Sequence, residues 1–288
     1  MEQSSIATGY SYITIRAEEI EKQYEALVGP WEKGRLLNRD AKLVHMAAHS
    51  ALAMSHLDLK RTDKSRIALV LATTLGTFES YETFFESMSN HEPKPTAFSN
   101  ALPNIAAGAL SVFYGLTGPS LTLSSGPDGG VDALMASLDM IEMGAVDAVL
   151  VGAWYMPSRT TALFDLPVEC EVALVLLESS EKASETRRAL ARICRSYQKN
   201  AAPVAETILA EPTNGERKDD TEKCRIYDSN GFRCNSMPDG RSLGVSVLRL
   251  LIKEIRRVHA ENGSSSLTVC QPGTVISFQM DGCAPCCS

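Results

Sequence analysis

The stretch Ser120-Leu-Thr-Leu-Ser-Ser-Gly-Pro-Asp-Gly-Gly130, with the apolar residues that follow it, decides the fold of this 288-residue chain. Residues 120–124 predict a short strand, and the glycines of residues 125–130 predict a turn. From Val131 to Met143 the apolar residues recur at helical spacing and share one face. A strand that turns through glycines into a helix favours an α/β protein.

Further strands and helices alternate on both sides of this stretch. Continuous apolar runs predict strands buried on both faces at 66–72, 146–153 and 171–177. Helical spacing covers 39–56, 77–88 and 243–259, and two short strands are expected at 267–270 and 274–280. Strands separated by helices favour parallel pairing. We therefore predict two α/β halves, residues 1–180 and residues 181–288, the second with a polar loop at 199–239.

Composition and charge exclude two classes of partner. The chain has 28 Lys and Arg against 35 Asp and Glu, a formal net charge of -7, which gives no general attraction for nucleic acid or anionic lipid. No apolar stretch reaches the length of a membrane span, and the N-terminus lacks the basic and apolar regions of a secretory signal. We expect a cytoplasmic protein that binds neither nucleic acid nor membrane.

The cysteines and histidines do not predict a metal site. Cys283, Cys286 and Cys287 cluster at the C-terminus, but no second Cys/His pair lies at zinc-finger spacing, so we interpret them as free thiols. His45 and His49 stand four residues apart on a predicted helix without the glutamate of an HExxH motif, which favours a helix-surface or packing role. No metal and no cofactor is predicted.

Residues 102–110, 114–124 and 129–134 resemble the β-ketoacyl synthase family, whose members are similar to LPNMAAGxxxxxxGLxGPSLTxSTACASGxxAL in this region. The resemblance implies the thiolase-like fold of that family. Two similar α/β halves would be layered α-β-α-β-α, here with shortened loops, which agrees with the two halves predicted above.

The same resemblance implies that the family's Cys-His-His set is missing. The nucleophilic cysteine belongs where the strand turns into the helix, and Pro127 stands there with no nucleophilic atom and no backbone N–H. Residues 240–248 resemble the motif GHTxGAAGxxxL, with Arg241 in place of the histidine. Guanidinium can bind an anion but does not cycle a proton near neutral pH. The turn at 271–273, where the second histidine is expected, contains none.

Chain-length factors are members of this family that lack the nucleophile, pair with an active synthase as a heterodimer and shape its product tunnel. The compressed segment after Val151 is similar to that of the short chain-length-factor-like proteins of bacterial aryl-polyene clusters. In better-known members glutamine replaces the cysteine, and Pro127 departs from this, which argues against a priming decarboxylase. We expect a non-catalytic partner of an active β-ketoacyl synthase that meets an acyl carrier protein through the complex.

The resemblance also implies two sets of site residues. Bulky side chains on the helix upstream of the nucleophile turn end the tunnel in chain-length factors, although aromatic residues at helical spacing are also typical of core packing. An apolar strand at the family's dimer face needs a partner, because an exposed one invites aggregation. The tunnel residues are Phe78, Tyr81, Glu82 and Phe85, and the interface residues are Pro103, Asn104, Ser120, Leu121, Thr122, Leu123 and Ser124.

Two other functions stay open. An acyl hydrolase or decarboxylase with altered chemistry would use Ser125, Asp128 or Arg241, and a serine nucleophile would need a base within hydrogen-bond reach. No histidine lies in the motifs that feed this turn. A homodimeric acyl-binding scaffold would use the same dimer face without a synthase partner.

Overall fold

The structure is a computed structural model that describes residues 5–163, 166–181, 183, 189–199, 225–227, 245–271 and 274–282. Several predicted features lie outside the described residues: Arg241, the three C-terminal cysteines, the turn residues 272–273 and most of the polar loop at 199–239. The side chain of Pro127 also lies outside the description.

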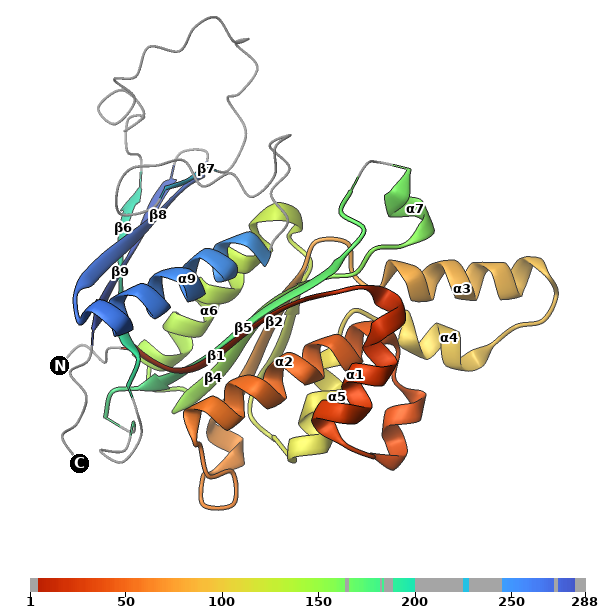
Figure 1. The fold of residues 1–288 in the computed structure, drawn as a ribbon, viewed down its shortest axis with the longest axis horizontal. Helices are drawn as coiled ribbons and strands as arrows, with labels where there is room; N and C mark the ends of the chain where they lie inside the picture. The colour runs from red at the N-terminus through yellow and green to blue at the C-terminus, as the bar shows by residue number, and fades with distance from the viewer. Residues whose placement is uncertain are drawn as a thin grey trace, which may run out of the picture.

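The described strands form one nine-stranded sheet in the order β3-β2-β4-β5-β1-β6-β9-β8-β7 (Figure 1). The strands are β1 (Ser5–Ile15), β2 (Ile67–Thr73), β3 (Ser120–Leu123), β4 (Ala148–Tyr155), β5 (Cys170–Ser179), β6 (Ala191–Lys199), β7 (Arg225–Tyr227), β8 (Ser264–Gln271) and β9 (Thr274–Gly282).

Helices cover the sheet in layers. They are α1 (Ile20–Val28), α2 (Arg39–Ser55), α3 (Phe78–Ser89), α4 (Pro95–Asn100), α5 (Ile105–Tyr114), α6 (Gly129–Glu142), α7 (Arg159–Ala162) and α9 (Val245–Glu261). Helices α1, α2 and α5 lie on one face, and α6 and α9 lie between the strands β1, β2, β4, β5 and the strands β6, β8, β9 (Figure 1). This confirms the α/β class. The described elements supply the layers α-β-α-β, and no described helix forms the fifth layer of the expected α-β-α-β-α. The division at residue 180 stays a prediction.

Strands β2, β4 and β5 are apolar over most of their length because both of their faces are buried. In β4, Val149 and Val151 belong to the core shared with α6 and α9, whereas Leu150 and Trp154 belong to the core under α2 and α5. The strands β2 and β5 alternate between the two cores in the same way. The continuous apolar runs therefore correctly predicted doubly buried strands.

The prediction of parallel pairing holds for only part of the sheet. Strand β2 pairs parallel with β3 and β4, but the other described pairs are antiparallel. Parallel strands are usually joined by a full crossover helix, and the described part of the link from β4 to β5 contains only the four-residue helix α7. Strand β1 pairs with β5 along its length and with β6 through residues 5–7, so it joins the two parts of the sheet.

Gly9 allows β1 to approach α2 closely. A Cβ atom on Gly9 would stand 2.1 Å from the carbonyl oxygen of Ala51, a backbone atom that cannot swing away. We expect Gly9→Ala to lower the free energy of unfolding by about 1–3 kcal/mol, measured by urea denaturation, because the extra methyl overpacks the contact.

The matched control for this prediction is Gly108→Ala. Gly108 lies on α5 with no atom within 4 Å of a built Cβ. Alanine is favoured over glycine inside a helix by about 0.5–1 kcal/mol, so the same change should stabilise the chain there. Effects of the same sign at the two positions would contradict this account of Gly9.

Candidate functional site

The predicted strand–turn–helix is present, and Pro127 lies on its turn. After β3 and the two serines, the 3-10 turn η4 (Gly126–Asp128) leads directly into α6. Gly126 has a φ of 67°, in the left-handed region that favours glycine. A Cβ on Gly129 would stand 3.2 Å from the Cβ of Ala72, so the start of α6 packs tightly on β2.

The chemical groups around this turn are limited. Ser124 and Ser125 are exposed, and Asp128 is half-buried with one carboxylate oxygen that has no hydrogen-bond partner among the described residues. The N-terminus of α6 favours negative charge. The described turn therefore offers hydroxyl groups and a carboxylate, while the other predicted residue of this pocket, Arg241, lies outside the described residues.

Three predicted segments meet at the carboxyl ends of β2 and β3. The hydroxyl of Thr74, in the loop after β2, donates to the carbonyl of Gly126 at 3.4 Å. The hydroxyl of Thr77, just before α3, donates to the carbonyl of Ala101 at 2.5 Å. These bonds bring the start of α3, the segment at 101–104 and the nucleophile turn together. Ligands of open α/β sheets bind at this end of the strands.

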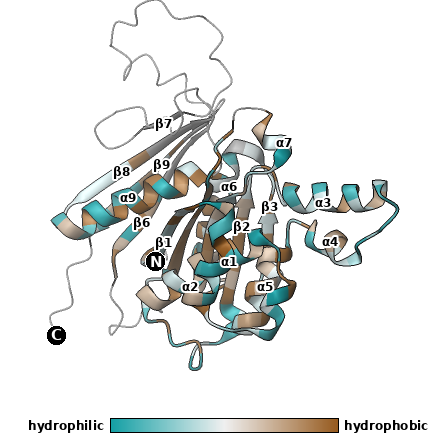
Figure 2. Ribbon diagram, turned by 45° about the vertical axis from the view of Figure 1, so that its right-hand side comes forward, coloured by the Kyte–Doolittle hydropathy of each residue, from teal (hydrophilic) through white to brown (hydrophobic). Residues whose placement is uncertain are grey.

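Helix α3 stands clear of the sheet (Figure 2), and several of its aromatic side chains are exposed to solvent. Phe78 and Tyr81 are each 37% exposed, and Phe85 is 62% exposed. Their spacing of three and four residues puts them in one row, which we call the aromatic stripe (Phe78, Tyr81, Phe85). Exposure of this size argues against the core-packing alternative for these residues. It leaves them free to meet another molecule.

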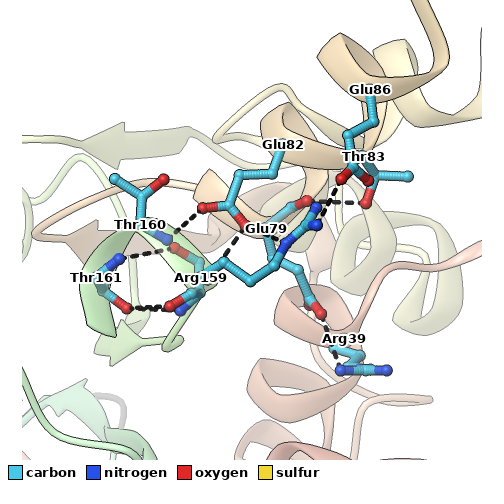
Figure 3. Close-up of polar contacts among 9 residues, drawn as sticks. Arg39, Glu79, Glu82, Thr83, Glu86, Arg159, Thr160 and Thr161 are labelled. Atoms are coloured by element: carbon cyan, nitrogen blue, oxygen red, sulfur yellow. Dashed lines mark hydrogen bonds and ion pairs between the residues drawn. The ribbon is translucent and has the colours of Figure 1, made fainter. Parts of the chain in front are cut away.

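Glu82, the fourth predicted tunnel residue, turns instead onto α7 (Figure 3). Its side chain is only 13% exposed and accepts the backbone N–H groups of Thr160 at 2.7 Å and Arg159 at 3.2 Å. Burial alone would raise the pKa of Glu82, but these hydrogen bonds outweigh burial and lower the pKa. Glu82 thereby satisfies free donors at the start of α7 and holds that helix against α3.

The predicted interface residues lie along an open edge of the sheet. Strand β3 pairs only with β2 among the described strands, and Ser120 and Leu121 are exposed. The half-buried residues Thr122 and Leu123 continue the strand, and Asn104 is exposed at the start of α5. Pro103 lies beside the turn before α3, 3.7 Å from a Cβ built on Gly76. An edge strand of this kind is a template for pairing with another chain.

A buried carboxyl group that the sequence did not single out as a site lies behind α3. Asp40 is fully buried in the first turn of α2 and accepts the indole N–H of Trp154 at 2.9 Å. Its second oxygen has no partner among the described residues, and burial raises the pKa of Asp40 to about 7. Asp40 lies in the first turn of this helix, and the cap is Asn38, whose side chain accepts the N–H of Ala41 at 2.9 Å.

The buried cysteine near Asp40 is not a reactive thiol. Cys170 lies in the core with its Sγ 3.3 Å from the Sδ of Met156. Burial, with the nearby charge of Asp40, raises the pKa of Cys170 to about 12. The thiol is therefore protonated near neutral pH, and a thiolate is the nucleophilic form.

His45, the first histidine of the pair, is a core packing residue. His45 is fully buried, with Nδ1 3.0 Å from the hydroxyl of Tyr24, and its ring contacts Trp31 and Phe113 edge-on. Burial lowers the pKa of His45 to about 4. Over the part of the chain that the structure describes, no three metal-ligating side chains gather at one point, and no helix could span a membrane.

Comparisons with known proteins agree with this fold. Residues 31–165 match the family model described as beta-ketoacyl synthase, N-terminal domain. A 3-oxoacyl-[acyl-carrier-protein] synthase 2 from Staphylococcus aureus is 20% identical over 170 residues, 58% of this chain and 39% of that protein. A synthase of the same name from Vibrio cholerae is 28% identical over 109 residues, 37% of this chain and 26% of that protein. The chain thus spans 39% or less of the length of these relatives.

Solved structures are similar over almost the whole chain. A type II PKS acyl-carrier protein in complex with its ketosynthase bound to the hexaketide (AntDE:AntF) has a TM-score of 0.71 at 14% identity. The ishigamide ketosynthase/chain length factor has 0.67 at 15%, and a beta-ketoacyl synthase from Burkholderia phymatum STM815 has 0.69 at 15%. Each comparison covers 98% of this chain and 100% of the other.

The layered sheet and its strand–turn–helix edge have the thiolase-like fold of the ketosynthases to which the chain is similar. Residues 31–165, slightly less than half of the chain, are similar to the N-terminal domain of the β-ketoacyl synthase family. The predicted family resemblance and the predicted fold are confirmed.

Asp40 makes a prediction about pH. The pKa is about 7 in the fold against an ordinary value of 3.8, so ionisation costs more in the folded chain. The Asp40 contribution to stability is complete below pH 4 and is lost as pH rises through 7. Between pH 5 and 8 the wild type should lose about 2 kcal/mol of unfolding free energy relative to Asp40→Asn.

The measurement is urea denaturation of both proteins across this pH range. Asparagine keeps an acceptor for the Trp154 indole, so the difference between the two pH profiles reports ionisation alone. Parallel profiles would show that Asp40 is charged in the fold at low pH.

Proposed function

We propose that this chain is a non-catalytic, chain-length-factor-like partner of an active β-ketoacyl synthase. The observation that carries the proposal is the exposed aromatic stripe, which stands beside an open edge strand and next to a turn where Pro127 takes the position of the family's cysteine. A surface that is apolar and unpaired in this way fits a protein partner.

The two subunits would divide the reaction between them. The cysteine of the synthase would carry the acyl chain and condense it with a malonyl group held on an acyl carrier protein. This chain would complete the product tunnel, and the aromatic stripe would end it, because a large side chain closes a hydrophobic channel that a small one leaves open. A polyene of the aryl-polyene type is the product class that the compressed segment after Val151 favours, because that segment resembles the short chain-length-factor-like proteins of aryl-polyene clusters.

The decisive experiment is co-purification with an active β-ketoacyl synthase from the same genome, followed by a condensation assay with malonyl-loaded carrier protein. We expect a stable heterodimer that condenses and no condensation by this chain alone. Activity of this chain alone, or activity that survives replacement of the partner's cysteine, would overturn the proposal.

Leu121→Lys tests the interface. Leu121 is 37% exposed on the edge strand, so the change should leave folding intact while a buried lysine disrupts pairing across the dimer. We expect the dissociation constant of the complex to rise by about 10-fold or more, measured by calorimetry. The matched control is Met54→Lys on α2, where the side chain is 39% exposed, and there the affinity should not change.

Phe85→Ala tests the tunnel end. Removing the most exposed ring of the aromatic stripe should lengthen the products of the complex, read by mass spectrometry, and Phe78→Ala should act in the same direction. Met143→Ala, which removes an exposed side chain from the end of α6, should leave product length unchanged. Identical products from both phenylalanine variants would exclude the stripe as the stop.

A second candidate is an acyl hydrolase or decarboxylase with altered chemistry. The unpartnered buried oxygen of Asp128 near Ser125 is the observation that favours it. Incubation of this chain with malonyl- and acyl-carrier protein separates the candidates, because a covalent adduct or turnover would support the enzyme. If native mass spectrometry shows a homodimer and no complex with the synthase, the result would instead support an acyl-binding scaffold.

A further inference from the structure

Helix α3 carries a second row of side chains beside the aromatic stripe. Glu79, Glu82 and Glu86 recur at the spacing of the stripe, each one residue further along, and we call them the acidic row (Glu79, Glu82, Glu86). Whereas the aromatic stripe faces solvent, the acidic row faces other elements of the protein (Figure 3). One helix thus presents a free face and an anchored face.

Most contacts of the acidic row end on Arg159, the first residue of α7. The guanidinium of Arg159 lies 2.5 Å from Glu86 and 3.7 Å from Glu82, and the backbone N–H of Arg159 donates to Glu82 at 3.2 Å. The next N–H, that of Thr160, donates to the same carboxylate at 2.7 Å. The hydrogen bond from Arg159 lowers the pKa of Glu86, so both carboxylates are ionised at neutral pH.

The third member of the acidic row is anchored elsewhere. Glu79 pairs with Arg39 of α2 at 2.8 Å, next to the start of the helix. Helix α3 is therefore tied near its start to α2 and along its middle to α7. Because α3 stands clear of the sheet, these ties are the described ionic contacts that fix its direction (Figures 1 and 3).

We propose that Arg159 is a positioning residue for the aromatic stripe. By holding Glu82 and Glu86 it sets the angle at which α3 presents Phe78, Tyr81 and Phe85, and product length thus depends on a residue that does not line the tunnel. The inference rests on the proposed function, since the stripe must end a tunnel for its angle to matter.

Helix α7 suits this task. It has only four residues, and its own capping box joins Ser158 and Thr161, with the Ser158 N–H donating to Thr161 at 2.6 Å and the Thr161 N–H to Ser158 at 3.2 Å. It follows directly on β4, which is buried along its whole length. The contacts of Arg159 with Glu82 and Glu86, which we call the clamp, therefore connect α3 to the central sheet rather than to another surface segment.

The test compares Arg159→Met with wild type in the full chain, alone and with the synthase. Methionine keeps an apolar stem and removes the charge. An exposed ion pair is worth up to about fivefold in an equilibrium, so losing both should make the amides of α3 exchange with deuterium about 3- to 10-fold faster. At saturating partner, the products should become longer and more varied in length.

Two variants frame this result. Arg159→Lys keeps one charge but cannot hold two carboxylates as a guanidinium does, so it should give an intermediate product shift. Arg61→Met removes another exposed arginine that pairs only with Asp58 among the described residues, and it should change neither exchange nor products.

The outcomes separate the two proposals. If α3 exchanges faster in Arg159→Met but the products do not change, the positioning role is overturned and the proposed heterodimer is unaffected. Unchanged exchange would overturn the clamp itself. If the wild-type chain forms no active complex, the proposed function fails and the positioning role fails with it, whatever the exchange shows.

Discussion

A β-sheet leaves unpaired N–H and C=O groups at its edges, and the place where this sheet ends governs the rest of the molecule. Strands β2, β4 and β5 are paired on both sides and buried on both faces, so their backbone groups have no free partners to offer. Strand β3 ends the described sheet with exposed residues at its start, and the nucleophile turn, α3 and the segment at 101–104 gather beside it. The backbone N–H and C=O groups of β3 that have no partner in the described sheet form a surface with which a second chain can pair.

The apolar strands and the amphipathic helices could be predicted from the sequence because each has a distinct hydrophobic pattern. Strand β1 could not be predicted in this way. It lies in the middle of the sheet yet carries polar residues such as Thr8, which a continuous apolar run excludes. The structure tolerates Thr8 because its hydroxyl donates to the buried carboxylate of Glu178 at 2.7 Å. Glu178 lies 170 residues from Thr8 along the chain, so no local sequence pattern predicts this hydrogen bond.

The candidate site also has features that the sequence predicts and features that it does not. The positions of the aromatic stripe and of Pro127 followed from motifs, since a motif fixes where a residue stands along the chain. Which face of α3 meets solvent did not follow, because the answer depends on Arg159, which lies 77 residues beyond Glu82. Asp40 shows the same limit, since burial in the folded chain raises its pKa and its hydrogen-bond partner Trp154 lies 114 residues away.

An exposed side chain and an anchored one also differ in what a change costs the protein. The aromatic stripe contributes little to folding because its rings remain in water, so its size can change without loss of stability. Glu82 is nearly buried and satisfies two backbone donors, so its removal would leave unpaired groups behind. The tunnel role proposed for this chain would need both kinds of residue side by side. The helix would have to be held by contacts that resist change, and it would have to present a stop whose size can vary. On α3 the acidic row supplies the anchoring contacts and the aromatic stripe supplies the exposed rings, and the two rows are offset by one residue.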